Sequence, residues 1–516
     1  MKNQIVHSVE NEHESIPFAD ILLHYTENFV KTLENRTISV TVKDKLHQNL
    51  LQEMSSAAEI TLQEELNHFK NSGENFYPDY TRSALLSLPV KYPVLDKMLT
   101  VMAENYALHV ANIFSNFHKD IDLISETFSI ANDAAIIDID TSLGDGHGGE
   151  STALITLSGG FKLIYKPRSL DTSVSYNLFI DWVNAKLDVK LKTLKCINLK
   201  KYGWLEFVPY VPVDSDEELK EYYYKAGILL AVTFLLGSKD YHSENLIAAG
   251  KDPVIIDHET IIQPVLKNQP SIRTWDEAHK IPEFSVLESM LIVNQDTGAT
   301  LQCAGYGVAG NVETMDMEMK IIHPNTIDSK RETRFVFRKL IKQNIPVYNG
   351  KNIFVTHYKA SFLKGFSAAY DLFMNAKEEL LSPGSPVNYF SSQKTRYIWR
   401  PTFVYFRILK YMRGAAFMAS FEAYHSKLYE LMSKAYQKEG FKNLQFILDS
   451  EMAQMLKGDI PFFNLNSSDS HLQEGEIVEI FKYNCVENIR QRIHILSEKH
   501  KDEQTGYILK WLDMNA

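Results

Sequence analysis

The stretch DYHSENLIAAGKDPVIIDHE, at residues 240–259, decides how the fold of this chain is interpreted. Its central residues, Gly250 to Pro253, are turn formers between two short apolar runs, so they predict a β-hairpin. Asp240 and Asn245 precede the hairpin, and Asp257 follows its second strand. Carboxylate and amide oxygens are ligands that Mg²⁺ accepts in proteins. The stretch therefore predicts a group of oxygen donors around a short hairpin.

This order of residues is typical of phosphoryl transfer. In kinases a catalytic-loop Asp orients the attacking hydroxyl, an Asn shortly after it holds Mg²⁺, and a second Asp holds the metal that bridges the phosphates. We predict these roles for Asp240, Asn245 and Asp257, with His242 as a catalytic neighbour and Glu259 as a further metal ligand. The order Asp-x-His-x-x-Asn departs from the His-Arg-Asp order of protein kinases and resembles the catalytic loop of lipid kinases.

Ordinary turn formation is the structural alternative, because Asp, Asn and Gly are also common turn residues. It explains residues 250–253. It does not explain Asp240 and Asn245 directly after the apolar run Ala226 to Leu236, nor Asp257 directly after a buried strand. The kinase interpretation is therefore favoured.

A glycine-rich loop lies upstream, with a Gly-x-Gly-x-x-Gly pattern at Gly144, Gly146 and Gly149. This pattern is weak evidence by itself. Alternating residues over 152–166, interrupted by a glycine turn, predict a hairpin whose second strand ends at Lys166. A glycine loop, a hairpin and a strand lysine form the phosphate-covering half of a kinase, so these residues are predicted to bind nucleotide. An exposed strand lysine is the alternative for Lys166.

Two further motifs, YKPRSL at residues 165–170 and YGWLEFV at residues 202–208, complete a family pattern. Together with the motifs above they resemble the dehydratase domain of class II lanthipeptide synthetases, the LanM enzymes, from about Phe76 to Leu509. The resemblance implies a lipid-kinase-like core that uses ATP and Mg²⁺ to phosphorylate Ser and Thr of a precursor peptide with a leader. It also implies elimination of the phosphate, with ADP retained or used, to give dehydroalanine or dehydrobutyrine.

The motif TRYIWRPTFVY, at residues 395–405, resembles the elimination motif of that family. By this resemblance Arg396 and Thr402 are the elimination pair. A guanidinium can hold a departing phosphate through two parallel N–H bonds, which suits this step. The alternative is that Arg396, Arg400 and Arg407 are surface residues.

Asp145 and His147 lie inside the glycine loop, where they could serve nucleotide binding, elimination or turn geometry. We keep both residues as catalytic candidates. The sequence does not identify the base that removes the Cα proton. Two alternative functions remain at this point. One is a peptide kinase that phosphorylates without elimination, and the other is a non-catalytic peptide-binding relative, which the intact Asp240, Asn245 and Asp257 disfavour.

Composition sets broader limits. The chain has 516 residues, 45% of them apolar, and can bury more than one core. A net charge of −11 and a pI near 5.9 argue against a nucleic-acid surface. The segment Met1 to Ser15 lacks the apolar core of a secretory signal, and the run Ala226 to Leu236 is too short to span a bilayer. We expect a cytoplasmic protein without a transmembrane segment.

The cysteines Cys196, Cys303 and Cys485 are far apart and fit a reducing compartment. LanM enzymes carry a C-terminal cyclase with a zinc ion on Cys and His ligands, and no pair at zinc-ligand spacing occurs here. Ring formation is therefore not carried over by the resemblance. We expect a free-standing dehydratase, a partner of a separate cyclase, or an excised domain.

The predicted fold is α+β, a lipid-kinase-like bilobal core with extensive helical additions. Its parts are expected to follow one another as a helical region at 1–135, an N-lobe with the glycine loop at 136–212, a C-lobe with the catalytic and metal-binding loops at 213–345, and a helical region carrying the elimination motif at 346–516.

Overall fold

The computed structural model describes most of the chain and is an α+β structure with 54% helix and 16% strand. This confirms the predicted fold class, whereas the bilobal lipid-kinase-like arrangement stays a prediction. The segment Met1 to Ser15 and Cys303 lie outside the described residues, which are 16–267, 281–293, 304–307, 313–339, 343–397, 399–437, 444–472 and 478–514.

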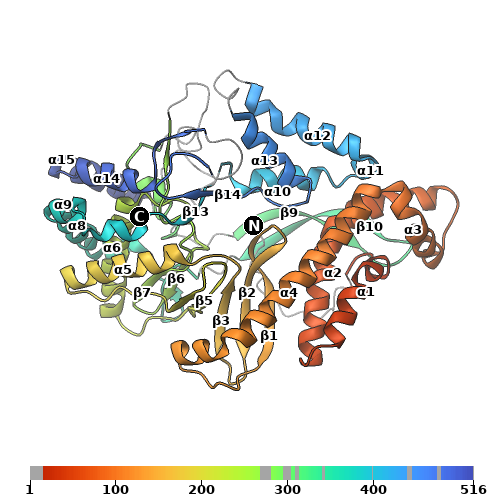
Figure 1. Cartoon of the computed structure of the whole chain (residues 1–516), viewed down its shortest axis with the longest axis horizontal. Helices are drawn as coiled ribbons and strands as arrows, with labels where there is room; N and C mark the ends of the chain where they lie inside the picture. The colour runs from red at the N-terminus through yellow and green to blue at the C-terminus, as the bar shows by residue number, and fades with distance from the viewer. Residues whose placement is uncertain are drawn as a thin grey trace. The chain divides into compact units, whose positions relative to one another are not determined.

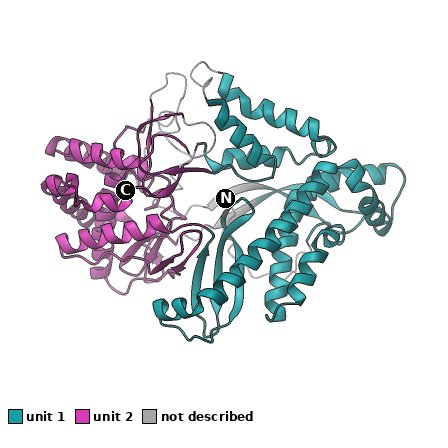
Figure 2. Cartoon of the chain, in the orientation of Figure 1, with its two compact units in different colours: residues 1–167, 313–339, 400–462 teal, residues 168–312, 340–399, 463–516 magenta. Residues whose placement is uncertain are grey.

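The chain divides into two compact units, coloured separately in Figure 2. Unit 1 contains residues 1–167, 313–339 and 400–462, and unit 2 contains the remainder. Each unit is thus assembled from segments that are far apart in sequence. The four consecutive ranges expected from the sequence stay a prediction.

Unit 1 combines long N-terminal helices with an antiparallel meander and a separate hairpin (Figure 1). Strand β1 pairs with β2 and β2 pairs with β3, while β9 pairs with β10. Its elements are α1 (Ala19–Glu34), α2 (Val40–Asn71), α3 (Tyr77–Lys91), α4 (Pro93–Phe128), β1 (Ile136–His147), β2 (Glu150–Leu157), β3 (Lys162–Lys166), β9 (Glu313–Ile322), β10 (Lys330–Lys339), α10 (Thr402–Tyr411), α11 (Ala415–Met418), α12 (Phe421–Ser433), η5 (Lys434–Gln437) and α13 (Gln445–Met455).

Helix α4 buries an apolar stripe, because its apolar residues recur at steps of three or four positions along the sequence. Leu95, Leu99 and Val110 are fully or almost fully buried. The helix lies against the meander, where the Asn116 side chain donates a 3.0 Å hydrogen bond to the Tyr165 hydroxyl on β3. The three-residue and four-residue spacing of the sequence therefore identifies the face that supports the glycine-loop strands.

The helical residues between Ala415 and Tyr436 form separate helices rather than one continuous helix. Helix α11 ends at Met418, and α12 begins at Phe421. Ser420 caps the second helix, since its side chain accepts a hydrogen bond from the Ala423 amide. A side-chain cap of this kind satisfies an orphan N–H and starts a new helix.

Unit 2 contains helices and several two-stranded antiparallel pairs (Figure 1). The pairs are β4 with β5, β6 with β7, β8 with β15, β11 with β12, and β13 with β14. Its elements are α5 (Asp171–Leu187), β4 (Cys196–Asn198), β5 (Gly203–Glu206), α6 (Asp216–Leu236), β6 (Leu246–Ala249), β7 (Asp252–Ile255), β8 (Val265–Leu266), η1 (Val286–Ser289), β11 (Val347–Tyr348), β12 (Lys351–Asn352), η3 (Val355–Tyr358), α8 (Lys359–Asn375), α9 (Lys377–Leu381), η4 (Pro386–Phe390), β13 (Lys394–Tyr397), β14 (Phe463–Asn466), β15 (Phe481–Tyr483), α14 (Cys485–Ile495) and α15 (Glu498–Met514).

Helix α6 forms the core of unit 2 and positions the hairpin β6–β7. It packs closely on α8 because glycines sit at the crossing: a Cβ on Gly227 would lie 2.0 Å from the Phe362 carbonyl oxygen, and one on Gly365 would lie 1.9 Å from that of Tyr224. From the same helix the buried Lys225 ammonium contacts the Asp252 carboxylate at 2.6 Å. The predicted hairpin is thereby fixed to the most buried helix of the unit.

No helix among the described residues is long and apolar enough to cross a membrane.

Candidate active site

The catalytic-loop candidates follow the end of α6 in a strained turn. Gly237 caps the helix in the left-handed region with φ 68°, and Asp240 adopts φ 67°, which is unusual for a residue with a side chain. The Asn245 side-chain amide donates a 2.8 Å hydrogen bond to the Asp240 carbonyl oxygen. Its amide oxygen is then the atom that can act as a metal ligand.

His242 faces the Asp240 carboxylate. Its Nδ1 accepts a 3.3 Å hydrogen bond from the Glu244 amide, so the remaining ring proton resides on Nε2. Nε2 lies 3.9 Å from Oδ1 of Asp240. This distance is too long for a hydrogen bond. The catalytic role of His242 therefore stays a prediction.

The residues after β7 alternate in direction. The His258 ring turns inward, where it is buried, stacks on Tyr176 with ring centroids 4.4 Å apart and lies 3.1 Å from the Ser173 hydroxyl. Asp257 and Glu259 on either side of it interact with each other, because the Glu259 amide donates to Oδ1 of Asp257 at 3.1 Å. His258 thus fixes this segment to helix α5, which carries Ser173 and Tyr176.

Strand β13 brings Arg396 to this segment. Nη1 of Arg396 lies 3.7 Å from Oε2 of Glu259. The Thr395 hydroxyl donates a 2.9 Å hydrogen bond to the Glu259 carbonyl oxygen, and the Gln263 side chain donates a 2.7 Å hydrogen bond to the Arg396 carbonyl oxygen. The predicted elimination residue Arg396 and the predicted metal ligand Glu259 therefore meet within unit 2.

Arg168 reaches the same carboxylate and was not among the predicted site residues. Its Nη1 donates a 2.8 Å hydrogen bond to Oε2 of Glu259. The only sequence signal was its place in the motif YKPRSL, two positions after Lys166. Spacing alone does not show which acidic residue an arginine will contact.

Tyr241, the residue after Asp240, is fully buried. Burial raises the pKa of the Tyr241 phenol well above its usual value, and the negative charges of Asp257 and Asp240 raise it further. Both carboxylates therefore lie near one buried, neutral side chain.

No group of three or more His, Cys, Asp or Glu side chains in the described part of the chain is arranged to hold a metal ion. Kinases hold Mg²⁺ with few protein ligands, because the phosphates and water supply the rest. The Asn245 side-chain amide and the Asp257 carboxylate supply oxygen atoms, which are the ligands that this ion requires. These two side chains therefore have the ligand chemistry that fits Mg²⁺.

The other predicted residues belong to unit 1. Gly144 and Gly146 lie in β1, and Gly148 and Gly149 form the turn to β2 with φ of 62° and 76°. Two consecutive positive φ angles suit a tight hairpin turn, which explains a pair of glycines there. The side chain of Asp145 is outside the described residues.

A loop after α13 covers the glycine turn. The Gly149 amide donates a 3.3 Å hydrogen bond to Oδ1 of Asp459, and the Ile460 carbonyl oxygen lies 2.9 Å from Nδ1 of His147. The ring of Phe462 also packs on His147 with centroids 5.2 Å apart. Burial raises the pKa of the Asp459 carboxyl, and the backbone hydrogen bonds from Gly149 and Gly148 oppose that rise.

Lys166 and Thr402 are also in unit 1. Lys166 ends β3 and is almost fully buried, so the exposed-lysine alternative is wrong. Thr402 is the first residue of α10. Just before it, the Arg400 guanidinium makes two hydrogen bonds, of 2.7 and 3.0 Å, with the fully buried Glu451. Arg400 is therefore a structural residue, whereas Arg407 is exposed on α10.

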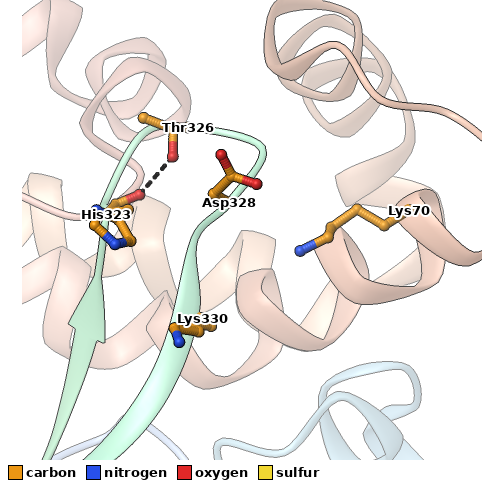
Figure 3. A pocket seen from close by; sticks show the side chains of 5 residues that line it. All are labelled: Lys70, His323, Thr326, Asp328 and Lys330. Atoms are coloured by element: carbon orange, nitrogen blue, oxygen red, sulfur yellow. Dashed lines mark hydrogen bonds between the residues drawn. The ribbon is translucent and has the colours of Figure 1, made fainter.

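A pocket of about 550 Å³ lies elsewhere in unit 1. Figure 3 shows Lys70 extending from the end of α2 toward the β9–β10 turn, where the Thr326 hydroxyl donates a 2.8 Å hydrogen bond to the His323 carbonyl oxygen. Asp328 and Lys330 complete the lining. None of these five lining residues was predicted to take part in catalysis.

A family model described as a domain of unknown function, DUF4135, matches residues 92–466. The chain belongs to the DUF4135 family. The matched region contains every candidate site residue named above, from Gly144 to Thr402. Membership therefore covers both the catalytic-loop motif and the elimination motif.

A curated relative of this DUF4135 protein is the lacticin 481/lactococcin biosynthesis protein LcnDR2 of Lactococcus lactis subsp. lactis. It is 26% identical over 494 residues, which cover 89% of this chain and 50% of the relative. The chain thus spans about half the length of this relative. The match confirms the family resemblance predicted from the motifs.

Proposed function

We propose that this DUF4135 protein acts in lanthipeptide biosynthesis as a dehydratase, phosphorylating Ser and Thr of a precursor peptide and then eliminating the phosphate. Its relative LcnDR2, whose name refers to lacticin 481 and lactococcin biosynthesis, supports the biosynthetic role. The observation that supports the two-step chemistry best is the contact of Arg396 with Glu259. It joins a residue of the elimination motif to the segment with the metal-ligand candidate Asp257.

In the first half-reaction, Asp240 would accept the proton of the substrate hydroxyl. Its carboxylate is 39% exposed, so a peptide can reach it. Asn245 and Asp257 would hold Mg²⁺ through oxygen atoms, and Lys166 with the glycine loop would hold the nucleotide. ATP with Mg²⁺ would supply the phosphoryl group that passes to the hydroxyl oxygen.

In the second half-reaction, a base removes the Cα proton, the C–H electron pair becomes the Cα=Cβ bond, and the Cβ–O bond breaks. The electrons of that bond leave on the phosphate. Arg396 would stabilise the growing charge with guanidinium N–H groups. Thr402, Asp145 and His147 remain candidates for orienting the phosphate or moving protons in this step.

Mass spectrometry tests the proposal. The full chain is incubated with candidate precursor peptides, ATP and Mg²⁺, and we expect peptides that have lost water. Phosphate gained and retained would instead indicate the kinase-only alternative. No change with any peptide and no ATP consumption would support a non-catalytic peptide-binding protein. The precursor peptide is the proposed partner of this chain. A separate cyclase as a second partner stays a prediction.

A further inference from the structure

The turn between β1 and β2 is supported from two sides within unit 1. On one side Gly149 lies against helix α4, since a Cβ at this position would come 2.5 Å from the Asn105 Cβ. On the other side lies the loop after α13, where the Asp459 carboxylate accepts a 3.3 Å hydrogen bond from the Gly149 amide. The Gly148 amide donates a further backbone hydrogen bond to the same carboxylate. The glycine turn is therefore held by a residue 310 positions away in the sequence.

The loop that carries Asp459 is closed onto α13 by one residue, Gln454. The Gln454 side-chain amide donates a 3.1 Å hydrogen bond to the Phe462 carbonyl oxygen, and its oxygen accepts a 2.8 Å hydrogen bond from the Phe462 amide. The Asp459 amide donates a 3.2 Å hydrogen bond to the Gln454 carbonyl oxygen. Both ends of the segment 459–462 are thus fixed by contacts that do not involve the glycine turn.

The same segment orients the ring of His147. The Ile460 carbonyl oxygen lies 2.9 Å from Nδ1 of His147. A carbonyl oxygen can only accept a hydrogen bond, so Nδ1 carries the proton, and in the neutral imidazole the lone pair lies on Nε2. The Phe462 ring packs on the imidazole with centroids 5.2 Å apart, which restricts its rotation. The loop therefore fixes both the orientation and the tautomer of a catalytic candidate.

We propose that Asp459 is a positioning residue of the glycine-rich loop, and that the segment 459–462 holds the β1–β2 turn and the His147 imidazole in the geometry that the reaction uses. This inference rests on the proposed function, in which the glycine loop binds nucleotide and His147 is a catalytic candidate. Asp459 acts through the backbone of the turn rather than on the reacting atoms. Such support affects the rate because a misplacement of about 1 Å in a reacting group can cost about 100-fold.

Hydrogen–deuterium exchange of the turn amides tests the inference without substrate. The peptic peptide that contains Gly148 and Gly149 is followed by mass spectrometry after exchange of the full chain. Asp459→Ala should speed its exchange by roughly 3- to 10-fold, as expected for the loss of one net hydrogen bond. Asp459→Asn should keep most of the protection, because its amide oxygen can accept the same bond.

The matched control is Asp449→Ala. Asp449 is an exposed residue of α13, and its carboxylate accepts a 2.9 Å hydrogen bond from the Gln445 side chain. The variant removes the same charge and a hydrogen bond from the same helix without touching the glycine turn. Exchange at the turn and turnover should both stay as in the wild type.

Gln454→Ala provides an independent test, because it leaves Asp459 in place and releases the loop from α13. Exchange at the turn should rise as it does in Asp459→Ala. Nitrogen NMR shifts of isotope-labelled histidine, with His147 assigned from the His147→Gln variant, report the tautomer at a pH where the imidazole is neutral. The wild type should show the proton on Nδ1, and Gln454→Ala should show a mixture of both tautomers.

Turnover separates positioning from stability. Asp459→Ala should lower kcat for loss of water from the precursor peptide by roughly 10-fold or more at an unchanged melting temperature. Asp459→Asn should restore most of kcat. A purely structural role would instead lower activity only in proportion to lost stability.

The inference is overturned if Asp459→Ala leaves turn exchange or kcat unchanged, or if Asp459→Asn behaves like Asp459→Ala in both measurements. A wild type that modifies no peptide would refute the proposed function alone, since the exchange and NMR measurements still decide whether Asp459 and its loop hold the turn and His147. Should Asp459→Ala fail to fold, exchange and tautomer in Gln454→Ala decide.

Discussion

Nη1 of Arg396 lies 3.7 Å from Oε2 of Glu259, so a residue of β13 contacts the segment that follows β7. The Thr395 hydroxyl reinforces this contact through the Glu259 carbonyl oxygen. Substitutions of Arg396 and of the neighbouring metal-ligand candidate Asp257 should therefore affect one centre. We expect them to affect different steps, because a guanidinium has no lone pair for Mg²⁺ and a carboxylate repels phosphate.

Asp240→Ala should abolish phosphorylation. Loss of a general base typically slows a reaction by about 10²–10⁴. The peptide should then be neither phosphorylated nor dehydrated by mass spectrometry. Glu244→Gln is the control, since its side chain is 57% exposed in the same loop and has no predicted role. Full activity of Asp240→Ala would contradict the catalytic role that we predict for Asp240.

Arg396→Met should separate the two half-reactions. Transfer from ATP should continue because no Mg²⁺ ligand is lost, whereas release of phosphate should slow, so phosphopeptide accumulates. Thr402→Ala should act in the same direction, and Arg396→Lys should rescue only partly. Exposed Arg407→Met serves as the control on helix α10. Normal dehydration by Arg396→Met contradicts the prediction.

Glu451→Ala should strongly destabilise unit 1. Glu451 is fully buried and accepts hydrogen bonds from Arg400, from the Tyr405 hydroxyl at 2.6 Å and from the Tyr436 hydroxyl at 2.8 Å. Removing one partner of a buried ion pair costs about 3–5 kcal/mol. Tyr436→Phe removes one hydrogen bond and should cost about 1 kcal/mol. Urea unfolding measures the loss in free energy of unfolding for both variants. Equal losses for Glu451→Ala and Tyr436→Phe would contradict the prediction.

Gly149→Ala should be more damaging than Gly148→Ala. Both positions have positive φ, so either alanine introduces strain of about 1–2 kcal/mol. Only at Gly149 would the new Cβ lie 2.5 Å from the Asn105 Cβ, while nothing lies within 4 Å of it at Gly148. Thermal unfolding should rank the two variants, and Asn105→Gly should partly rescue Gly149→Ala. A Gly148→Ala variant as unstable as Gly149→Ala would show that φ alone decides.

His109 should make stability depend on pH. Burial lowers the pKa of His109 to about 4, and within the described residues neither ring nitrogen has a hydrogen-bond partner. The unfolded chain therefore binds the proton more tightly, so stability is full above pH 6.5 and falls as pH drops toward 4. The loss is on the order of 3 kcal/mol at 1.36 kcal/mol per pKa unit. His109→Leu should flatten this dependence in urea unfolding, and an unchanged slope contradicts the prediction.

The sequence by itself determined the local features of this protein. Turn residues predict the hairpin β6–β7, and the spacing of apolar residues predicts the buried stripe of α4. The order of Asp240, Asn245 and Asp257 is read directly from the sequence. Such features depend on neighbours within a few positions, because turns and helices are closed by short-range hydrogen bonds. The family resemblance came from the same local motifs.

Tertiary structure alone decided which distant side chains meet. Arg168 contacts Glu259 across 91 positions, and Thr395 contacts it across 136. Asp459 reaches the turn at Gly149 across 310 positions. No local pattern encodes such pairs, because the carboxylate partner of an arginine depends on how separate elements pack. A charge-assisted contact needs atoms placed within a few tenths of an ångström, and only the packed backbone places them.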